Sequence, residues 1–341
     1  MKKNILIFPF KREEIAYIKY FVEGAVFEKI YLGITGGIES DLEEYSLNVQ
    51  KYFGKQVEIV GTWNDCIEYV DYIWITSGRY ERYLSLQIEQ CIQKANELCK
   101  EVYIEDDKID EKTYGKKTDY LYRTNAILIT VGEFFEGSEG DVLLLEMASE
   151  LKKQGANTVC ILNRNVPNIK GLYGIPQQIK SGNYDGSEKV FLWNRYLRFL
   201  DETVSPDVIL IQVPGGMLHF PQKNWDDWGL KATYLFESID PDLVFVTIPF
   251  NMVYNKEIQL AFKYRFNISV DSYFLSKRII DFSAFNRNEG IGNLYANRKQ
   301  YLDVNIDSKI EKIEEKSIKT WAKKIKQDFL QDPFELVIFQ L

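Results

Sequence analysis

The sequence has only one histidine, His219, among its 341 residues. This scarcity excludes a zinc site built on several histidines, and it excludes a catalytic scheme that needs two. Acid–base chemistry would have to use carboxylates, lysine, tyrosine, cysteine or His219 alone. We interpret His219 as a hydrogen-bonded structural residue, with an acid–base role as the alternative. The sequence defines no catalytic centre and no metal site.

Cysteine is scarce as well, and no two cysteines form a CxxC pair. The four are Cys66, Cys91, Cys99 and Cys160. Cys91 and Cys99 fall on one predicted helix, whose rise separates them by about 12 Å. That distance is too long for a disulfide. We therefore expect buried free thiols.

Long apolar runs and an excess of positive charge are also missing. No apolar run reaches the roughly 18 residues that a transmembrane helix requires. The apolar run at residues 4–8 ends at Pro9, too early for a signal peptide. The formal net charge of −8 argues against broad nucleic-acid binding. We expect a cytoplasmic protein that has neither a membrane nor a nucleic acid as its partner.

What the sequence does contain is an alternation of short apolar strands and longer helices, which is typical of α/β proteins with parallel sheets. Residues 1–110 are predicted to form a Rossmann- or flavodoxin-like domain, residues 111–122 a charged linker, and residues 123–341 a P-loop-like α/β domain. In the first domain we expect strands at 5–8, 29–34, 57–60, 72–76 and 101–104, and helices at 12–22, 41–53, 64–70 and 81–100.

The second domain is predicted from the same kind of pattern. Strands are expected at 126–130, 158–162, 207–212, 243–248 and 334–339, and helices at 141–154, 187–200, 231–238 and 257–264. A short strand or turn is expected at 268–270. Residues 168–186 and 286–301 are predicted to be loops, the first of which packs little. Residues 306–330 are predicted to form one amphipathic helix.

A glycine-rich loop at residues 132–141 lies between a predicted strand and a predicted helix. The spacing of Gly132 and Gly137 matches the glycine frame of a P-loop, in which backbone N–H groups hold phosphates. A P-loop also needs lysine and then serine or threonine after its last glycine, whereas this sequence has Ser138 and Glu139. The loop combines a phosphate-binding backbone with the wrong charges.

The strand at 207–212 is predicted to lie beside this loop. In P-loop proteins such a strand ends in an acid that organises Mg²⁺, and the glycines beyond it sense the γ-phosphate. ATP or GTP with Mg²⁺ is therefore the candidate cofactor. The candidate ligand-binding residues are Gly132, Gly137, Ser138, Glu139, Gln212, Gly215 and Gly216.

The charges of the loop oppose tight nucleotide binding. The loop carries four acids, Glu133, Glu136, Glu139 and Asp141, and residues 126–151 contain no lysine or arginine. A like-charge pair at ~4 Å costs about 4 kcal/mol at an effective dielectric near 20. Three interpretations stay open. The first is a nucleotide site helped by Arg164, Lys223 or a divalent cation. The second is a degenerate loop that serves as a scaffold, and the third is a group of acids that holds a metal or a cationic group.

Three segments carry a resemblance to a known family. Residues 5–9 (ILIFP), 130–134 (TVGEF) and 212–216 (QVPGG) resemble the peptide maturation system proteins of clostridial-type bacteria. The resemblance implies an accessory role in modifying a ribosomally made peptide. It also implies partners, namely a Cys-containing precursor peptide, a radical SAM enzyme or an acyl-carrier-like protein. It supplies no catalytic residues.

Two further functions compete with that of an accessory protein that binds a nucleotide. One is a catalytically inert scaffold that presents peptide or carrier to an enzyme, and the other is a carboxylate-based enzyme that uses the acidic loop. The aromatic content of 14% suits a peptide groove. Peptide or carrier is expected to contact residues 132–141, 215–228 or 286–300. The lysines of the predicted C-terminal helix form a solvated face or a docking face for an acidic partner: Lys309, Lys312, Lys316, Lys319, Lys323, Lys324 and Lys326.

Overall fold

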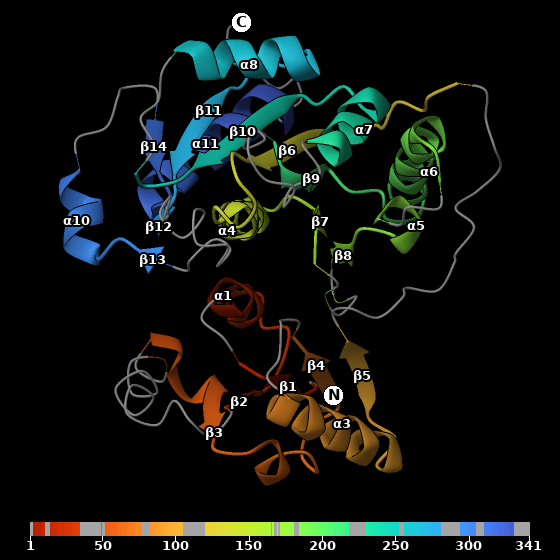
Figure 1. Ribbon diagram of the computed structural model, residues 1–341, viewed down its shortest axis with the longest axis vertical. Helices are drawn as coiled ribbons and strands as arrows, with labels where there is room; N and C mark the ends of the chain where they lie inside the picture. Colours follow the sequence, from red (N-terminus) through yellow and green to blue (C-terminus); the bar gives the residue numbers. More distant parts are fainter. Residues whose placement is uncertain are drawn as a thin grey trace, which may run out of the picture. The chain divides into compact units, whose positions relative to one another are not determined.

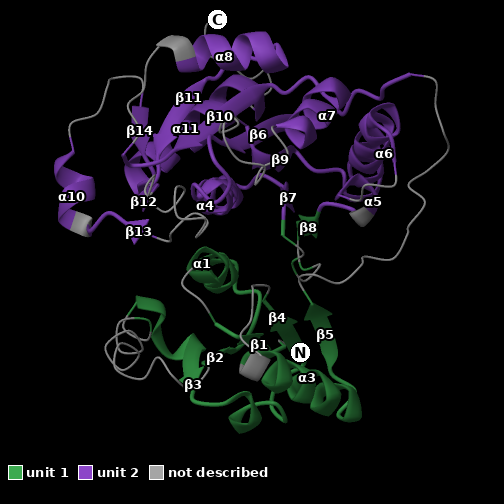
Figure 2. Ribbon diagram, viewed as in Figure 1, with its two compact units in different colours: residues 1–109, 164–174 green, residues 110–163, 175–341 purple. Residues whose placement is uncertain are grey.

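The computed structural model describes residues 3–10, 14–34, 49, 52–76, 82–104, 120–164, 166, 169, 171–180, 184–217, 229–251, 256–280, 294–304 and 310–330. The chain divides into two compact units (Figures 1 and 2). Unit 1 comprises Met1–Ile109 and Arg164–Gly174, and unit 2 comprises Asp110–Asn163 and Ile175–Leu341. Most of the predicted linker, residues 111–119, lies outside the described residues.

Unit 1 is built on a five-stranded parallel sheet with the order β3-β2-β1-β4-β5 (Figure 1). Its strands are β1 (Ile5–Phe8), β2 (Ile30–Gly33), β3 (Val57–Val60), β4 (Tyr72–Ile75) and β5 (Glu101–Ile104). This is the order of the first five strands of a Rossmann fold. All four residues of β1 are buried, as expected for the centre of a parallel sheet covered on both faces.

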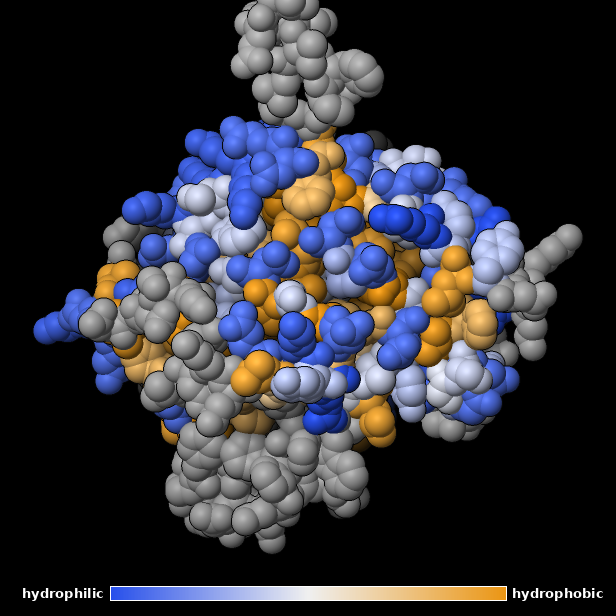
Figure 3. All heavy atoms as spheres, turned by 90° about the horizontal axis from the view of Figure 1, so that it is seen from above, coloured by the Kyte–Doolittle hydropathy of each residue, from blue (hydrophilic) through white to orange (hydrophobic). Residues whose placement is uncertain are grey.

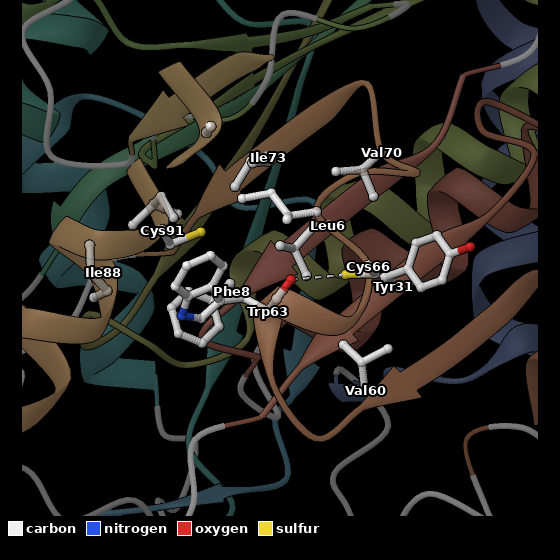
Figure 4. Packing of buried hydrophobic residues seen from close by; sticks show 13 residues of the cluster. Leu6, Phe8, Tyr31, Val60, Trp63, Cys66, Val70, Ile73, Ile88 and Cys91 are labelled. Atoms are coloured by element: carbon white, nitrogen blue, oxygen red, sulfur yellow. Dashed lines mark hydrogen bonds between the residues drawn. The ribbon is translucent and has the colours of Figure 1, made fainter. Parts of the chain in front are cut away.

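Helices cover both faces of this sheet. Helix α3 (Arg82–Glu97) buries Ile88, Cys91 and Ala95 in a cluster that includes Leu6 and Phe8 of β1 (Figure 4). The 3.6-residue period of a helix puts those three residues on one stripe. Helix α1 (Ile15–Glu23) packs aromatic side chains against Trp74, with ring centroids of Tyr17 and Trp74 5.3 Å apart. Because side chains alternate along a strand, Trp74 faces away from the cluster that holds its neighbours Ile73 and Ile75.

One predicted helix of unit 1 is wrong. Residues 64–70 form a short 3₁₀ helix (Trp63–Asp65) followed by turns. The carboxylate of Asp65 accepts the backbone N–H of Thr62 at 3.1 Å, which fixes the start of this turn. Cys66, Ile67 and Val70 are buried, and their spacing imitates one face of a helix. The apolar spacing of residues 64–70 therefore predicts correctly which side chains are buried, but it does not predict the conformation of the backbone.

Unit 2 contains six strands of a seven-stranded sheet with the order β14-β11-β10-β6-β9-β7-β8. They are β6 (Ile127–Glu133), β7 (Thr158–Leu162), β9 (Val208–Gly216), β10 (Leu243–Ile248), β11 (Ser272–Leu275) and β14 (Ile310–Lys312), and the seventh strand, β8 (Leu172–Gly174), falls in the segment Arg164–Gly174 of unit 1. Every described pairing from β14 to β7 is parallel. Central β6 lies between β9 and β10, so the segments that follow β6 and β9 meet at one edge of the sheet.

Unit 2 contains the helices α4 (Gly140–Lys153), α5 (Gln177–Lys180), α6 (Gly186–Val204), α7 (Leu230–Ser238), α8 (Lys256–Phe266), α10 (Arg298–Asp303) and α11 (Glu315–Ile325) (Figure 1). Of these, α4 and α7 pack directly against strands of the sheet. Helix α11 packs beside α4, and α6 beside α7. A two-stranded antiparallel ribbon is formed by β12 (Arg278–Ile279) and β13 (Leu294–Tyr295).

Helix α8 buries one stripe and exposes another. Its residues Ile258, Phe262 and Phe266 are buried at intervals of four. On the other side Leu260 and Tyr264 are 49% and 83% exposed. The face of the molecule seen in Figure 3 shows hydrophobic residues between hydrophilic ones. This helix therefore presents large apolar side chains to the surroundings.

Two predictions for the second domain are wrong. Residues 168–186 were expected to pack little, yet they contain β8 and α5 and bury Leu172, Ile175 and Ile179. Residues 306–330 do not form one helix, because β14 precedes α11 and Glu314 has an extended backbone (φ −143°, ψ 158°). Ile310 shares the apolar spacing of α11 but is a buried residue of β14. Apolar spacing alone cannot separate a strand from the helix that follows it.

Smaller differences concern the ends of elements. Helix α10 begins inside the segment that was expected to be a loop, and the strand expected near residues 268–270 lies at β11. Residues 334–339 and most of 41–53 lie outside the described residues. The prediction of an α/β protein with two parallel-sheet units is confirmed. Among the described residues no helix is long and apolar enough to cross a membrane.

Candidate functional site

The candidate site is the loop between β6 and α4 together with the end of β9. Val131 pairs with Gln212, and Glu133 pairs with Gly216 after a bulge in the register. The backbone N–H of Met217 donates to the carbonyl oxygen of Glu133 at 2.9 Å. All seven candidate residues lie on the adjoining strands β6 and β9 or in the segment from Gly137 to Glu139 that leads into α4. Their role in binding a ligand stays a prediction.

The side chain of Glu133 folds back into the loop and is only 3% exposed. Its Oε2 accepts the backbone N–H groups of Gly137 and of Ser138, the latter at 3.2 Å. Its Oε1 accepts the backbone N–H of Gly140 at 2.7 Å and Nε2 of Gln212 at 3.3 Å. Four N–H groups thus surround one carboxylate, in the loop where a P-loop would hold a phosphate.

Gln212 has its amide orientation fixed from both ends. Its Oε1 accepts the backbone N–H of Asn163 at 3.0 Å, so its Nε2 is the atom that faces Glu133. Where a P-loop protein would have an acid that organises Mg²⁺, this chain has a neutral donor aimed at its own carboxylate.

The environment of Glu133 changes its acidity in two opposite ways. Burial raises its pKa, and the negative charges of Asp141 and Glu136 raise it further. The N–H groups of Gly140 and Gly137 favour the ionised form and lower the pKa. The net result is a pKa of about 7. Proton binding to this buried carboxyl group therefore occurs near neutral pH.

The glycines of the loop allow these close approaches. A Cβ on Gly140 would lie 2.6 Å from Cγ and Oε1 of Glu133. Gly137 has φ 82°, and a Cβ there would lie 2.1 Å from Nη1 of Arg278. A Cβ on Gly132 would lie 2.1 Å from Sδ of the buried Met217. The glycine frame that the sequence shows is therefore required by packing inside the chain itself.

Glu139 is held by the segment after β11. Its carboxylate accepts the hydroxyl of Ser276 at 2.9 Å and the backbone N–H of Lys277 at 2.6 Å. Arg278 adds a hydrogen bond from Nη1 to the carbonyl oxygen of Gly137 at 2.6 Å. A P-loop would have a Mg²⁺-binding hydroxyl at the position of Glu139. Here the position serves to tie the loop to a neighbouring segment.

The electrostatic picture drawn from the sequence needs correction. Arg164 forms an ion pair at 2.9 Å with the fully buried Glu14 and lies over the ring of Tyr17, all within unit 1. The cation that reaches the loop is Arg278, which follows it by 141 residues. Lys223, the other cation expected there, lies outside the described residues. Because Arg278 is far from the loop in the sequence, the local sequence pattern could not show that this cation lies beside the loop.

A metal site at the acids of the loop has no support in the structure. Within the described parts of the chain, which include all four acids, no group of three or more His, Cys, Asp or Glu could hold a metal ion. Instead, Glu133 accepts backbone N–H groups, and Glu139 accepts from Ser276 and Lys277. Glu133 and Glu139 are therefore held by different partners, although the sequence places them in the same loop.

The remaining predicted features are placed as follows. Cys66, Cys91 and Cys160 are buried free thiols, and burial raises the pKa of Cys66 and Cys91 to about 12. Cys99 is a free thiol but is exposed, so the expectation of burial is wrong there. His219 and the other residues from 218 to 228 lie outside the described residues.

A hollow of about 540 Å³ lies at the opposite edge of the sheet of unit 2, near the start of β6 and β10. Its polar wall is already paired. Nδ2 of Asn194 donates to the carbonyl oxygens of Tyr122 and Ser238, and the hydroxyl of Tyr122 donates to Asp201 at 2.6 Å. These bonds connect α6 to the segment that enters β6, so we interpret the wall as structural.

Sequence reasoning missed Glu133, Gly140 and Arg278. Glu133 was counted as one of four loop acids that would repel phosphate, hold a metal or cationic group, or carry out carboxylate chemistry, and not as the anion that the loop itself binds. A signal was present, because Glu133 lies between Val131 and Phe134 in an apolar run, where a charged side chain must find partners. Arg278 had no comparable signal.

Comparison with known families and with curated proteins finds no match. Among solved structures, the chain is similar to a DUF1611 family protein from Anabaena variabilis ATCC 29413, with a TM-score of 0.56 and 10% identity over 95% of this chain and 99% of that chain. This similarity shows the fold alone.

Two other solved structures are similar at a lower level. One is the UDP-N-acetylmuramate:L-alanyl-gamma-D-glutamyl-meso-diaminopimelate ligase from Neisseria meningitides (TM-score 0.33, 10% identity, 80% of this chain and 78% of that chain). The other is a pseudomurein peptide ligase type C from Methanothermus fervidus (TM-score 0.30, 11% identity, 80% of this chain and 44% of that chain). These TM-scores are too low to carry an argument.

Proposed function

We propose that this protein is an accessory protein in the maturation of a ribosomally made peptide, and that it acts as a scaffold without nucleotide chemistry at the loop after β6. One observation carries the second part of this proposal. The carboxylate of Glu133 fills the cage of N–H groups in which a P-loop would bind a phosphate. A nucleotide would have to compete with an anion that is covalently part of the chain.

The charges of the loop strengthen this conclusion. Position 138 is serine, so no lysine is available there to neutralise a phosphate. A phosphate placed ~4 Å from one ionised carboxylate would pay about 4 kcal/mol at an effective dielectric near 20. The backbone N–H groups of Gly137, Ser138 and Gly140 already donate to Glu133, so they do not offset that cost while Glu133 stays in place.

The burial of Glu133 argues against the alternative of a carboxylate-based enzyme. A general acid or base must come within hydrogen-bond reach of its substrate. Glu133 has a pKa of about 7, which suits such a role, but it is 3% exposed and both oxygens accept N–H groups of the chain. Its unusual acidity is a consequence of burial in the loop.

The peptide-maturation part of the proposal comes from the resemblance of residues 5–9, 130–134 and 212–216. A Cys-containing precursor peptide, an acyl-carrier-like protein or a radical SAM enzyme is the proposed partner. Much of the surface expected to contact them, residues 218–228 and 281–293, lies outside the described residues. The exposed lysines of α11, such as Lys316 and Lys323, would attract an acidic partner in a salt-dependent way.

Two measurements test the proposal. Calorimetric titration with ATP or GTP and Mg²⁺ at pH 8, where Glu133 is ionised, is expected to show no binding at millimolar nucleotide and no hydrolysis. Titration with the precursor peptide and carrier encoded beside the protein is expected to show binding that weakens with salt. Nucleotide hydrolysis would overturn the scaffold, and a folded protein that binds neither partner would overturn the role in peptide maturation.

A further inference from the structure

The cage at the start of α4 is complete, and an element outside the helix fills it. Three of its donors are backbone N–H groups, and the fourth is Nε2 of Gln212 on β9. The anion comes from Glu133 at the end of β6. All four partners donate, so the position is built for negative charge.

We propose that Glu133 is an autoinhibitory contact: its carboxylate plugs the cage, and an external oxyanion of the phosphate type enters once that carboxylate is removed. This inference rests on the proposed function, because it explains why the loop binds no nucleotide as it stands.

Removal of the carboxylate leaves the cage without its acceptor. The N–H groups of Ser138 and Gly140 face the space that Glu133 occupies, and each residue is buried. A buried donor without a partner destabilises the folded protein. An oxyanion that satisfies several donors together would recover that cost.

The rest of the loop is held independently of the plug. Glu139 is bonded to Ser276 and Lys277, Arg278 donates to the carbonyl oxygen of Gly137, and the hydroxyl of Ser138 donates to the carbonyl oxygen of Phe135 at 2.7 Å. These bonds do not involve Glu133. The cage is therefore expected to keep its shape in a variant that lacks the plug.

Glu136 provides a matched control on the same loop. It is exposed, and it contributes a negative charge that Glu133 senses. Glu136→Ala removes one charge from the loop but leaves the cage filled. Glu133→Ala removes one charge and also empties the cage. Comparison of the two variants therefore distinguishes the effect of the loop's charge from the effect of filling the cage.

The test is the binding of inorganic phosphate at pH 8 and constant ionic strength, followed by calorimetry and by the shift in melting temperature. Glu133→Ala is expected to bind phosphate at least tenfold more tightly than the wild type and to melt at a higher temperature when phosphate is present. Glu136→Ala is expected to behave as the wild type.

Three outcomes would overturn the plug: a folded Glu133→Ala that binds no phosphate, a wild type that binds as tightly as the variant, or an equal gain in Glu136→Ala. If Glu133→Ala does not fold, Glu133→Ser carries the test. Its short side chain cannot reach across the cage, so at least tenfold tighter phosphate binding than the wild type is again expected, and its absence refutes the proposal. If the phosphate test fails, the proposed scaffold function is unaffected, because that function is tested by titrating the wild type with nucleotide.

Discussion

Glu133 makes the stability of unit 2 depend on pH in an unusual direction. Its pKa is about 7 in the folded protein against an ordinary value of 4.5, so the folded state binds the proton more tightly. Between these two values the folded protein holds more protons than the unfolded chain, and stability therefore falls as pH rises. Most acids that gain partners on folding have a lowered pKa and act in the opposite sense.

The expected size follows from the two pKa values. A pKa of about 7 in place of 4.5 corresponds to about 3 kcal/mol of folding free energy when the difference is fully expressed. Most of this, about 2–3 kcal/mol, is lost between pH 5 and pH 8, and little changes above that range. Because other groups titrate too, the useful quantity is the difference between the wild type and Glu133→Gln, which cannot ionise at this position.

Urea unfolding at pH 5, 6, 7 and 8 measures this difference, with hydrogen exchange of the amides of α4 as the readout specific to unit 2. The free energy of unfolding of the wild type, relative to Glu133→Gln, is expected to fall by about 2–3 kcal/mol from pH 5 to pH 8. A difference that stays constant, or that grows with pH, would refute the reasoning. It would mean that the four N–H donors outweigh burial and keep the carboxylate ionised throughout.

Three other predictions concern single contacts. Gly140→Ala is expected to destabilise unit 2 by about 1–3 kcal/mol, since its Cβ would overlap Glu133, and a double-mutant cycle with Glu133→Ala should show a smaller cost in that background. Arg164→Ala is expected to cost unit 1 about 3–5 kcal/mol in urea unfolding, because Glu14 stays buried without this cation. Arg198→Ala, which removes an exposed ion pair with Glu202, is the control and should cost less than about 1 kcal/mol. Ser138→Lys with Glu139→Ser is expected to bind no ATP with Mg²⁺ by calorimetry unless Glu133→Ala is added, and binding by the double variant alone would contradict the plug.

Much of the fold could be predicted from the sequence because parallel strands are buried on both faces. The runs at β1, β3, β7 and β10 are short, apolar and separated by helices, and this pattern is distinctive. Prediction failed where buried apolar side chains have the spacing of a helix but do not lie in one. Val70 and Ile310 have the apolar spacing of a helix but lie in a turn and in a strand, since the packing of the sheet decides their conformation.

The position of the candidate site was predicted from the sequence, but the contacts of its side chains were not. The glycine spacing located the loop, and the apolar strand ending in Gln212 located its neighbour. The direction in which Glu133 points depends on side-chain torsion and on four N–H groups that no spacing specifies. Arg278 reaches the loop only because β11 lies two strands from β6 in the sheet, with β10 between them. Such neighbours follow from topology, which local sequence patterns do not determine.

The composition of unit 1 has a consequence for how the chain folds during synthesis. Unit 1 includes Arg164–Gly174 in addition to Met1–Ile109, and Arg164 supplies the cation that pairs with the buried Glu14. At a typical elongation rate of about 5–20 residues per second, residue 174 follows residue 109 by roughly 3–13 seconds. During that interval the nascent unit 1 lacks the Arg164 cation that pairs with Glu14 in the folded protein, while β6, α4 and β7 are synthesised. Unit 1 therefore cannot reach its native state before residue 174 has been synthesised, and a fragment that ends at residue 110 is expected to lack the ion pair between Arg164 and Glu14.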